Sequence, residues 1–226
     1  MQNSTVMIGC EVVVKELNTR IPKDMPLHLI DPALHVNPDR LRKALQKAID
    51  QEERQYSTLL FGFGLCSRAM EGLQSQHARM VFPLVDDCIG IFLGSKAAHL
   101  EQIKKEPGTF FLSKGWIDAG TTPFEEYEYM VKRFGTDRAC RLMHRMLQNY
   151  TRLAFIDTGC GNDNRIDREY AKKKAVQFGL QYEEIIGTAS IFDNLIKADT
   201  CNSTHNELLI VPPGEKVTYE MLIKKG

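Results

Sequence analysis

The sequence lacks any apolar run long enough to cross a membrane, and it carries no excess charge of either sign. A transmembrane helix needs about 18 or more apolar residues in succession, whereas the apolar stretch 5–14 is interrupted by Glu11. Lysine and arginine total 29, and aspartate and glutamate also total 29, so the net charge is zero. Proteins that bind nucleic acid usually show a basic excess, and a neutral chain has no overall attraction to an anionic membrane. We therefore expect neither nucleic acid nor a membrane as a partner.

The segment before Cys10 lacks the features of a secretory signal. Met7-Ile8-Gly9-Cys10 resembles a lipoprotein cleavage box, but residues 1–5 contain no basic side chain and the apolar stretch is too short. We predict a cytoplasmic protein. In that reducing compartment, the six cysteines are expected to be free, catalytic or metal-bound rather than paired in disulfides.

Short apolar runs that alternate with amphipathic segments predict an α/β fold. Strands are expected at 5–14, 58–63, 78–85, 109–112, 153–157, 182–186 and 208–211, and most are followed by a helical pattern. Segment 17–37 is expected to be a long connection that could act as a lid. This alternation is typical of a mostly parallel, Rossmann-like sheet covered on both faces. We expect a single α/β domain over 1–226, either undivided or split into two similar halves, 1–115 and 151–226, by a helical connector at 116–150.

Four cysteines sit at the carboxyl ends of predicted apolar strand segments: Cys10 after Val6-Met7-Ile8-Gly9, and Cys66, Cys88 and Cys160 after three later runs. The carboxyl ends of parallel strands share one edge of a sheet, where ligands bind, so these cysteines are expected to converge. No C-x-x-C pair is present, which argues against a zinc ribbon or a thioredoxin-type motif. We predict that Cys10, Cys66 and Cys88 ligate an iron–sulfur cluster or zinc, and that Cys160 is a fourth ligand or a catalytic thiol. The alternative is that these cysteines are small buried hydrophobic residues.

Other polar and glycine residues fall at the same predicted edge. Asp86 and Asp87 are candidate catalytic carboxylates for proton transfer, although Asp87 could simply cap the following helix. Glycine-rich turns between a strand and a helix cradle anions, but no G-x-G-x-x-G or Walker pattern is present to indicate a nucleotide. The predicted substrate-binding residues are Gly64, Ser95, Lys114, Trp116, Gly159, Gly161 and Asn162.

Several short motifs also carry a family resemblance: Ile8-Gly9-Cys10-Glu11, Phe63-Gly64-Leu65-Cys66, Asp86-Asp87-Cys88-Ile89, Leu93-Gly94-Ser95 and Ser113-Lys114-Gly115-Trp116. Through them nearly the whole chain resembles an uncharacterised-domain family of methanogens and anaerobic bacteria. Members of that family are often encoded near corrinoid methyltransferases. The resemblance implies anaerobic one-carbon metabolism and oxygen-sensitive thiolate chemistry, and it implies a corrinoid protein or a methyltransferase as a partner. The family often has a histidine before the Asp-Cys pair, where this chain has Asp86.

These features together predict a cysteine-ligated metal protein that acts on a small anionic substrate or in methyl or one-carbon transfer. As an enzyme, it would be a metal-dependent transferase or lyase. One alternative is a non-enzymatic partner of methyltransferases that handles a metal or a corrinoid. Another is a protein that binds a small molecule and has only structural cysteines.

Overall fold

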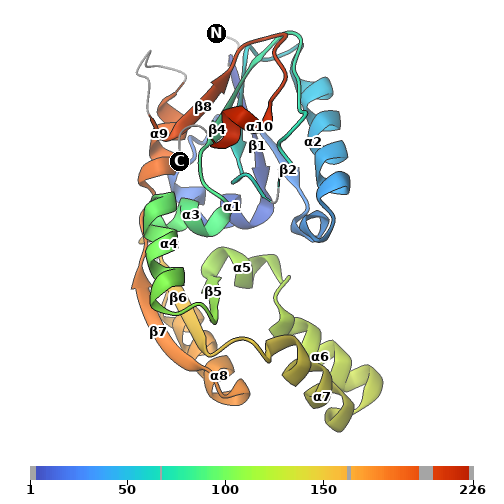
Figure 1. Cartoon of the computed structure of the whole chain (residues 1–226), viewed down its shortest axis with the longest axis vertical. Helices are drawn as coiled ribbons and strands as arrows, with labels where there is room; N and C mark the ends of the chain where they lie inside the picture. The colour runs from blue at the N-terminus through green and yellow to red at the C-terminus, as the bar shows by residue number, and fades with distance from the viewer. Residues whose placement is uncertain (1–3, 67, 162–163, 199–205, 224–226) are drawn as a thin grey trace.

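The structure is a computed structural model that describes residues 4–66, 68–161, 164–198 and 206–223. Its strands form two separate sheets (Figure 1). The first sheet has the order β2-β1-β3-β4-β8 and consists of β1 (Thr5–Cys10), β2 (Leu27–Ile30), β3 (Thr58–Gly62), β4 (Arg79–Pro83) and β8 (Leu208–Val211). Only β8 runs antiparallel to its neighbour. The second sheet is wholly parallel, with β5 (Thr109–Ser113), β6 (Arg152–Asp157) and β7 (Gln181–Ile186). The predicted Rossmann-like, mostly parallel α/β fold is confirmed.

The two sheets do not follow the order of the strands in the sequence. Strand β5 precedes residue 115 but pairs with β6, and β8 follows residue 151 but returns to pair with β4. The boundary between the sheets therefore differs from a division into 1–115 and 151–226. The helical segment between β5 and β6 contains α6 (Pro123–Phe134) and α7 (Thr136–Leu147), which extend as a hairpin beside the second sheet (Figure 1).

Helices cover the sheets on both sides. Helix α2 (Pro38–Glu52) packs on β1 and β2, whereas α9 (Ser190–Lys197) packs on β3 and β4. In the second sheet, α8 (Arg165–Phe178) packs on β6 and β7. The other helices are α1 (Glu11–Glu16), α3 (Cys88–Leu93), α4 (Lys96–Lys105), α5 (Lys114–Ala119) and α10 (Tyr219–Ile223), with 3-10 turns at Asn18–Arg20 and Pro32–Val36.

Two expectations about local structure are wrong. The first strand ends at Cys10, and the β-branched residues that follow it are helical. Val12, Val13 and Val14 are all buried in the hydrophobic core around the first sheet, which we call the first core. This packing outweighs their low helix propensity. Segment 17–37 is not one connecting loop, because it contains β2, which pairs in parallel with β1.

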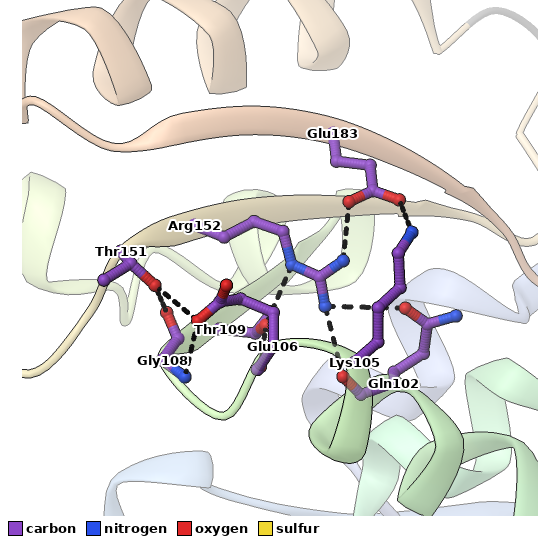
Figure 2. A network of polar contacts seen from close by, with 8 residues as sticks. All are labelled: Gln102, Lys105, Glu106, Gly108, Thr109, Thr151, Arg152 and Glu183. Carbon is purple, nitrogen blue, oxygen red and sulfur yellow. Dashed lines mark hydrogen bonds and ion pairs between the residues drawn. The ribbon is translucent and has the colours of Figure 1, made fainter.

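A buried arginine ties together the second sheet at the amino ends of its strands (Figure 2). Arg152 is 2% exposed, and its guanidinium donates to Thr109 Oγ1 at 2.9 Å, to Glu183 Oε2 at 2.6 Å and to the Gln102 carbonyl at 3.3 Å. These partners lie on β5, β7 and α4. Each of the three nitrogens of this buried group therefore has an acceptor, as a charge removed from water requires.

The carboxyl ends of the two sheets face each other. Helix α1, which follows β1, packs on α5, which follows β5. The loop after β6 accepts a hydrogen bond at the Cys160 carbonyl from Thr19, which follows α1. After β7, the Thr188 N–H donates to the Phe92 carbonyl of α3 at 2.8 Å. Helices α1, α3 and α5 lie between the sheets in Figure 1, so the strand ends of both sheets border one region.

Candidate functional site

Three of the four cysteines at predicted strand ends belong to the first sheet. Cys10 is the last residue of β1 and is 3% exposed. Cys66 lies four residues beyond the end of β3, and Cys88 begins α3 after β4. Because β1, β3 and β4 are parallel neighbours, their carboxyl ends lie side by side.

The thiols of Cys10, Cys66 and Cys88 lie within electrostatic range of one another. Burial raises the pKa of Cys10 to about 11. Burial also raises the pKa of Cys66, and Cys10 and Asp87 raise it further. The pKa of Cys88 is raised for the same reason, with added effects of Asp87, Cys10 and Cys66. The three thiols are thus neutral without a cation, and each disfavours the ionisation of its neighbours.

Trp116 of α5 reaches this cluster from the second sheet. Its indole N–H is buried and forms no hydrogen bond of standard geometry with the described residues. It nevertheless lies close enough to the Cys88 thiol to lower the pKa of that thiol against the effect of burial. A buried donor without a firm partner costs free energy, and this one is placed to stabilise negative charge on the Cys88 sulfur.

A cavity of about 500 Å³ opens beside the cysteines. Cys66 forms part of its wall, together with four charged side chains, Arg68, Asp86, Asp87 and Lys96. Its volume is in the range of small-molecule sites. The remaining lining residues are His35, Leu65, Tyr219 and Leu222.

Both aspartates of the cavity have partners. Asp87 caps α3, where its Oδ1 accepts from the N–H groups of Ile89 at 2.9 Å and Gly90 at 3.4 Å. The same oxygen lies 3.6 Å from Nδ1 of the buried His99. Asp86 forms an ion pair with Lys96, whose Nζ is 3.3 Å from Oδ1. Asp87 is therefore a helix cap and a wall of the cavity at once.

His35 contributes an imidazole that sequence reasoning did not select. Its Nδ1 is 2.9 Å from the Pro32 carbonyl, which can only accept, so Nδ1 carries the proton. Burial lowers the pKa of His35, which favours the neutral ring at pH 7 and leaves Nε2 as an acceptor. The ring stacks on Phe63 with centroids 5.9 Å apart.

The backbone of residues 64–66, which positions Cys66, packs closely against the backbone of residues 85–87. A Cβ on Gly64 would lie 2.5 to 2.7 Å from backbone atoms of Asp87, so only glycine allows this close approach. The Leu65 and Cys66 N–H groups donate to the carbonyls of Val85 and Asp86 at 2.8 and 2.9 Å. Cys66 has a φ of 44° and Arg68 a φ of 69°. Such left-handed non-glycine residues are strained and concentrate at functional sites.

Cys160 and its glycine-rich turn lie at the end of the second sheet. The Cys160 Sγ lies 3.6 Å from the Thr158 carbonyl. The N–H of Gly159 donates to Oδ1 of Asp157 at 3.0 Å, so an internal carboxylate already occupies this donor. Gly161 packs against the Asn164 side chain, and Asn162 lies outside the described residues.

Two further predicted binding residues have structural partners. Ser95 caps α4 by accepting from the Ala98 N–H at 3.0 Å. Lys114 forms ion pairs with Asp118 at 2.6 Å and with Asp167 at 4.0 Å. The cations that line the cavity are instead Arg68 and Lys96. Arg68 stacks over Tyr219, 4.3 Å from the ring centroid, and pairs with Glu71.

The donor atoms do not assemble around one point. Among the described residues, no three histidine, cysteine, aspartate or glutamate side chains form a group that could hold a metal ion. This geometry does not fit a single zinc ion in the present conformation, although the donor set remains one that thiophilic metals prefer.

The residues missed by sequence reasoning share a simple origin. His35 lies in the segment after β2, a strand that was not predicted, so its position at the sheet edge was hidden. Arg68 and Lys96 follow β3 and β4 by several residues and carry no motif. The rule that ligands bind at the carboxyl ends of parallel strands, here called the strand-end rule, would have found His35 once β2 was known.

Comparison with known proteins adds a family but no activity. A family described as "Protein of unknown function (DUF1638)" matches residues 29–196, which is more than half of the chain. The match includes Cys66, Cys88 and Cys160 but not Cys10. No curated protein and no solved structure matches the chain. No helix in the described segments has the length and apolar character to span a membrane.

Proposed function

The chain belongs to the DUF1638 family, and on that premise we propose that it is a metalloprotein whose Cys10, Cys66 and Cys88 hold an iron–sulfur cluster beside a cavity for a small anionic substrate. The observation that carries the proposal is the arrangement of three mutually interacting thiols at three adjacent strand ends. One of them, Cys66, lines a cavity that also has four charged side chains in its wall.

A cluster suits these thiols better than zinc does. A single zinc ion needs its ligands to meet at one point, and the described side chains contain no such group. In a 4Fe–4S cluster each thiolate would bind a different iron, so the three sulfurs would need no common point. Three protein ligands would leave one coordination position open. When bound, such a cluster would supply a Lewis acid toward a substrate oxygen.

The side chains of the cavity would position the substrate and move protons. Arg68 and Lys96 bring positive charge to the wall, and each is already held by a carboxylate of the chain. A substrate carboxylate would compete with Asp86 for Lys96 and release Asp86 as a base. His35 offers Nε2 as a second proton acceptor, because its Nδ1 is fixed by Pro32.

Methyl or one-carbon transfer and elimination of a substrate hydroxyl are both compatible with this set of groups. A partner in methyl transfer, such as a corrinoid protein, remains part of the proposal on the basis of the sequence resemblance.

A second function, small-molecule binding with structural cysteines, is favoured by one observation. Cys10 is buried within the first hydrophobic core, and Cys66 and Cys88 pack against that core. Such cysteines need no metal to be explained.

Anaerobic purification followed by iron, sulfide and zinc analysis separates the two functions. We expect stoichiometric iron and sulfide, lost in each of the Cys10→Ser, Cys66→Ser and Cys88→Ser variants. Cys140, an exposed thiol on α7, provides the matched control, and Cys140→Ser should keep full iron. Retention in Cys160→Ser would exclude a fourth ligand there. A metal-free protein that still binds a small molecule would overturn the metal proposal and support structural cysteines.

A further inference from the structure

A second cavity, of about 360 Å³, borders β5 in the second sheet. Four aromatic side chains line it, namely Phe110, Phe111, Trp116 and Tyr150. Thr121 and Pro123 close it on the side of α6, and Ile89 of α3 contributes from the first sheet. The volume is within the range of sites for small molecules.

The chemical character of this cavity differs from that of the first. No charged side chain lines it; threonine supplies the remaining polar groups. The first cavity, in contrast, contains two cations and two carboxylates. Moving an ion out of water into such surroundings without a partner is strongly unfavourable. The second cavity therefore selects against charged ligands.

Polar groups without partners are nevertheless available at its walls. The Tyr150 hydroxyl forms no hydrogen bond with any described residue, and the Trp116 N–H is also without a firm partner in the described part of the chain. Strand β5 is the outermost strand of its sheet, so its outer edge presents backbone N–H and C=O groups. Thr109, Phe110, Phe111 and Leu112 of this strand all line the cavity. A ligand thus meets aromatic faces together with a few donors and acceptors.

We propose that this cavity binds an uncharged, planar aromatic compound that carries an amide-like edge. The ring would pack against the aromatic wall of the cavity at the outer edge of β5, and its amide-like edge would bond to Tyr150 or to the backbone of β5. Aromatic stacking of this kind contributes beyond simple burial. The proposal does not depend on a metal at the cysteines. Because Trp116 lines this cavity and also lies close to Cys88, a bound ring would change the surroundings of the Cys88 thiol.

The test uses one NMR signal. Trp116 is the only tryptophan, so the spectrum of the ¹⁵N-labelled, metal-free chain contains a single indole N–H resonance. The probes are benzamide, its charged analogue benzoate, and the non-planar cyclohexanecarboxamide. We expect benzamide to shift this resonance saturably, with an affinity about tenfold or more above that of either other probe.

Variants at the rim provide the second arm. Thr121 is exposed and lies in the short connection before α6, so Thr121→Phe should fill the cavity and abolish the shift, whereas Thr121→Ser should preserve it. Tyr150→Phe keeps the ring and should weaken binding several-fold. Failure of benzamide to give a saturable shift in the wild type, equal binding of benzoate, or undiminished binding by a folded Thr121→Phe chain would each overturn the proposal. Repeating the titration on the metal-loaded protein separates this result from the metal assignment.

Discussion

Replacing Glu183 with leucine should destabilise the protein more than replacing Arg152 with methionine, although Arg152 makes more of the hydrogen bonds (Figure 2). The reason is burial. The Arg152 side chain is 2% exposed, whereas that of Glu183 is 29% exposed. In Glu183→Leu the guanidinium stays buried with only neutral acceptors, and breaking a buried pair in this way costs about 3–5 kcal/mol.

Replacing Arg152 instead of Glu183 leaves no unpaired charge buried. In Arg152→Met the Glu183 carboxylate reaches water and keeps Lys105 at 2.6 Å. The Thr109 hydroxyl still donates to the Glu106 carbonyl at 2.6 Å, and methionine fills most of the space of the arginine stem. We therefore expect a loss of only about 1–2 kcal/mol. The double variant should resemble Arg152→Met, because it no longer contains the unpaired buried charge.

Urea unfolding of the four proteins measures these free energies directly, and each kcal/mol corresponds to about 2–4 °C in Tm for a chain of this size. Lys105→Met is the control, since that ion pair is 60% exposed on the lysine side and should contribute less than about 1 kcal/mol. If Arg152→Met proved as costly as Glu183→Leu, the number of hydrogen bonds rather than desolvation would govern this network, and the reasoning would be refuted.

Three further predictions concern the strand ends where the sheets meet. Burial raises the pKa of Glu16 above its ordinary value of 4.5, so the stability that its proton confers is present at low pH and is lost as pH rises through the raised value. Glu16→Gln should remove this loss. When Tm is measured across that pH range, the Tm of the variant relative to that of the wild type should increase as pH rises, and a constant difference in Tm would contradict the prediction. Gly64→Ala should cost about 1–3 kcal/mol in urea unfolding, because the new Cβ would meet the Asp87 backbone, and wild-type stability would show that the loop can relax. Cys88→Ala should shift the Trp116 indole N–H resonance, whereas Cys160→Ala should not, and the reverse pattern would disprove the placement of Trp116.

Most of the fold was predictable because apolar runs and caps carry strong local signals. Asn37 caps α2 through the Asp39 and Arg40 N–H groups, as its place before Pro38 suggested. Strand β2 was missed because it lies at a sheet edge, with Leu27 43% and Leu29 52% exposed, so it has no buried apolar pattern. The partition into two sheets depends on long-range pairing of β5 and β8, which no local pattern encodes.

The candidate site was predictable only where the strand-end rule applied to correctly read strands. It brought together Cys10, Cys66 and Cys88, which follow neighbouring strands of one sheet. It could not reveal that the Gly159 N–H is taken by Asp157, because that bond depends on the shape of the turn. Nor could it show that Lys114, directly after β5, is paired with Asp118, or that Lys96, at the start of α4, lines the cavity.

The facing arrangement of the sheets explains why Trp116 joins the cysteines and why Cys160 has a different environment. Contact between α1 and α5 brings the first turn of α5 against the first sheet, where Glu16 accepts from the Gly115 N–H at 2.6 Å. This bond fixes the residue next to Trp116 and so places the indole at Cys88. The end of β6 instead meets Thr19, beyond α1, through the Cys160 carbonyl. Trp116 thus comes from the second sheet, whereas the three thiols come from the ends of neighbouring strands of the first sheet and the segments that follow them.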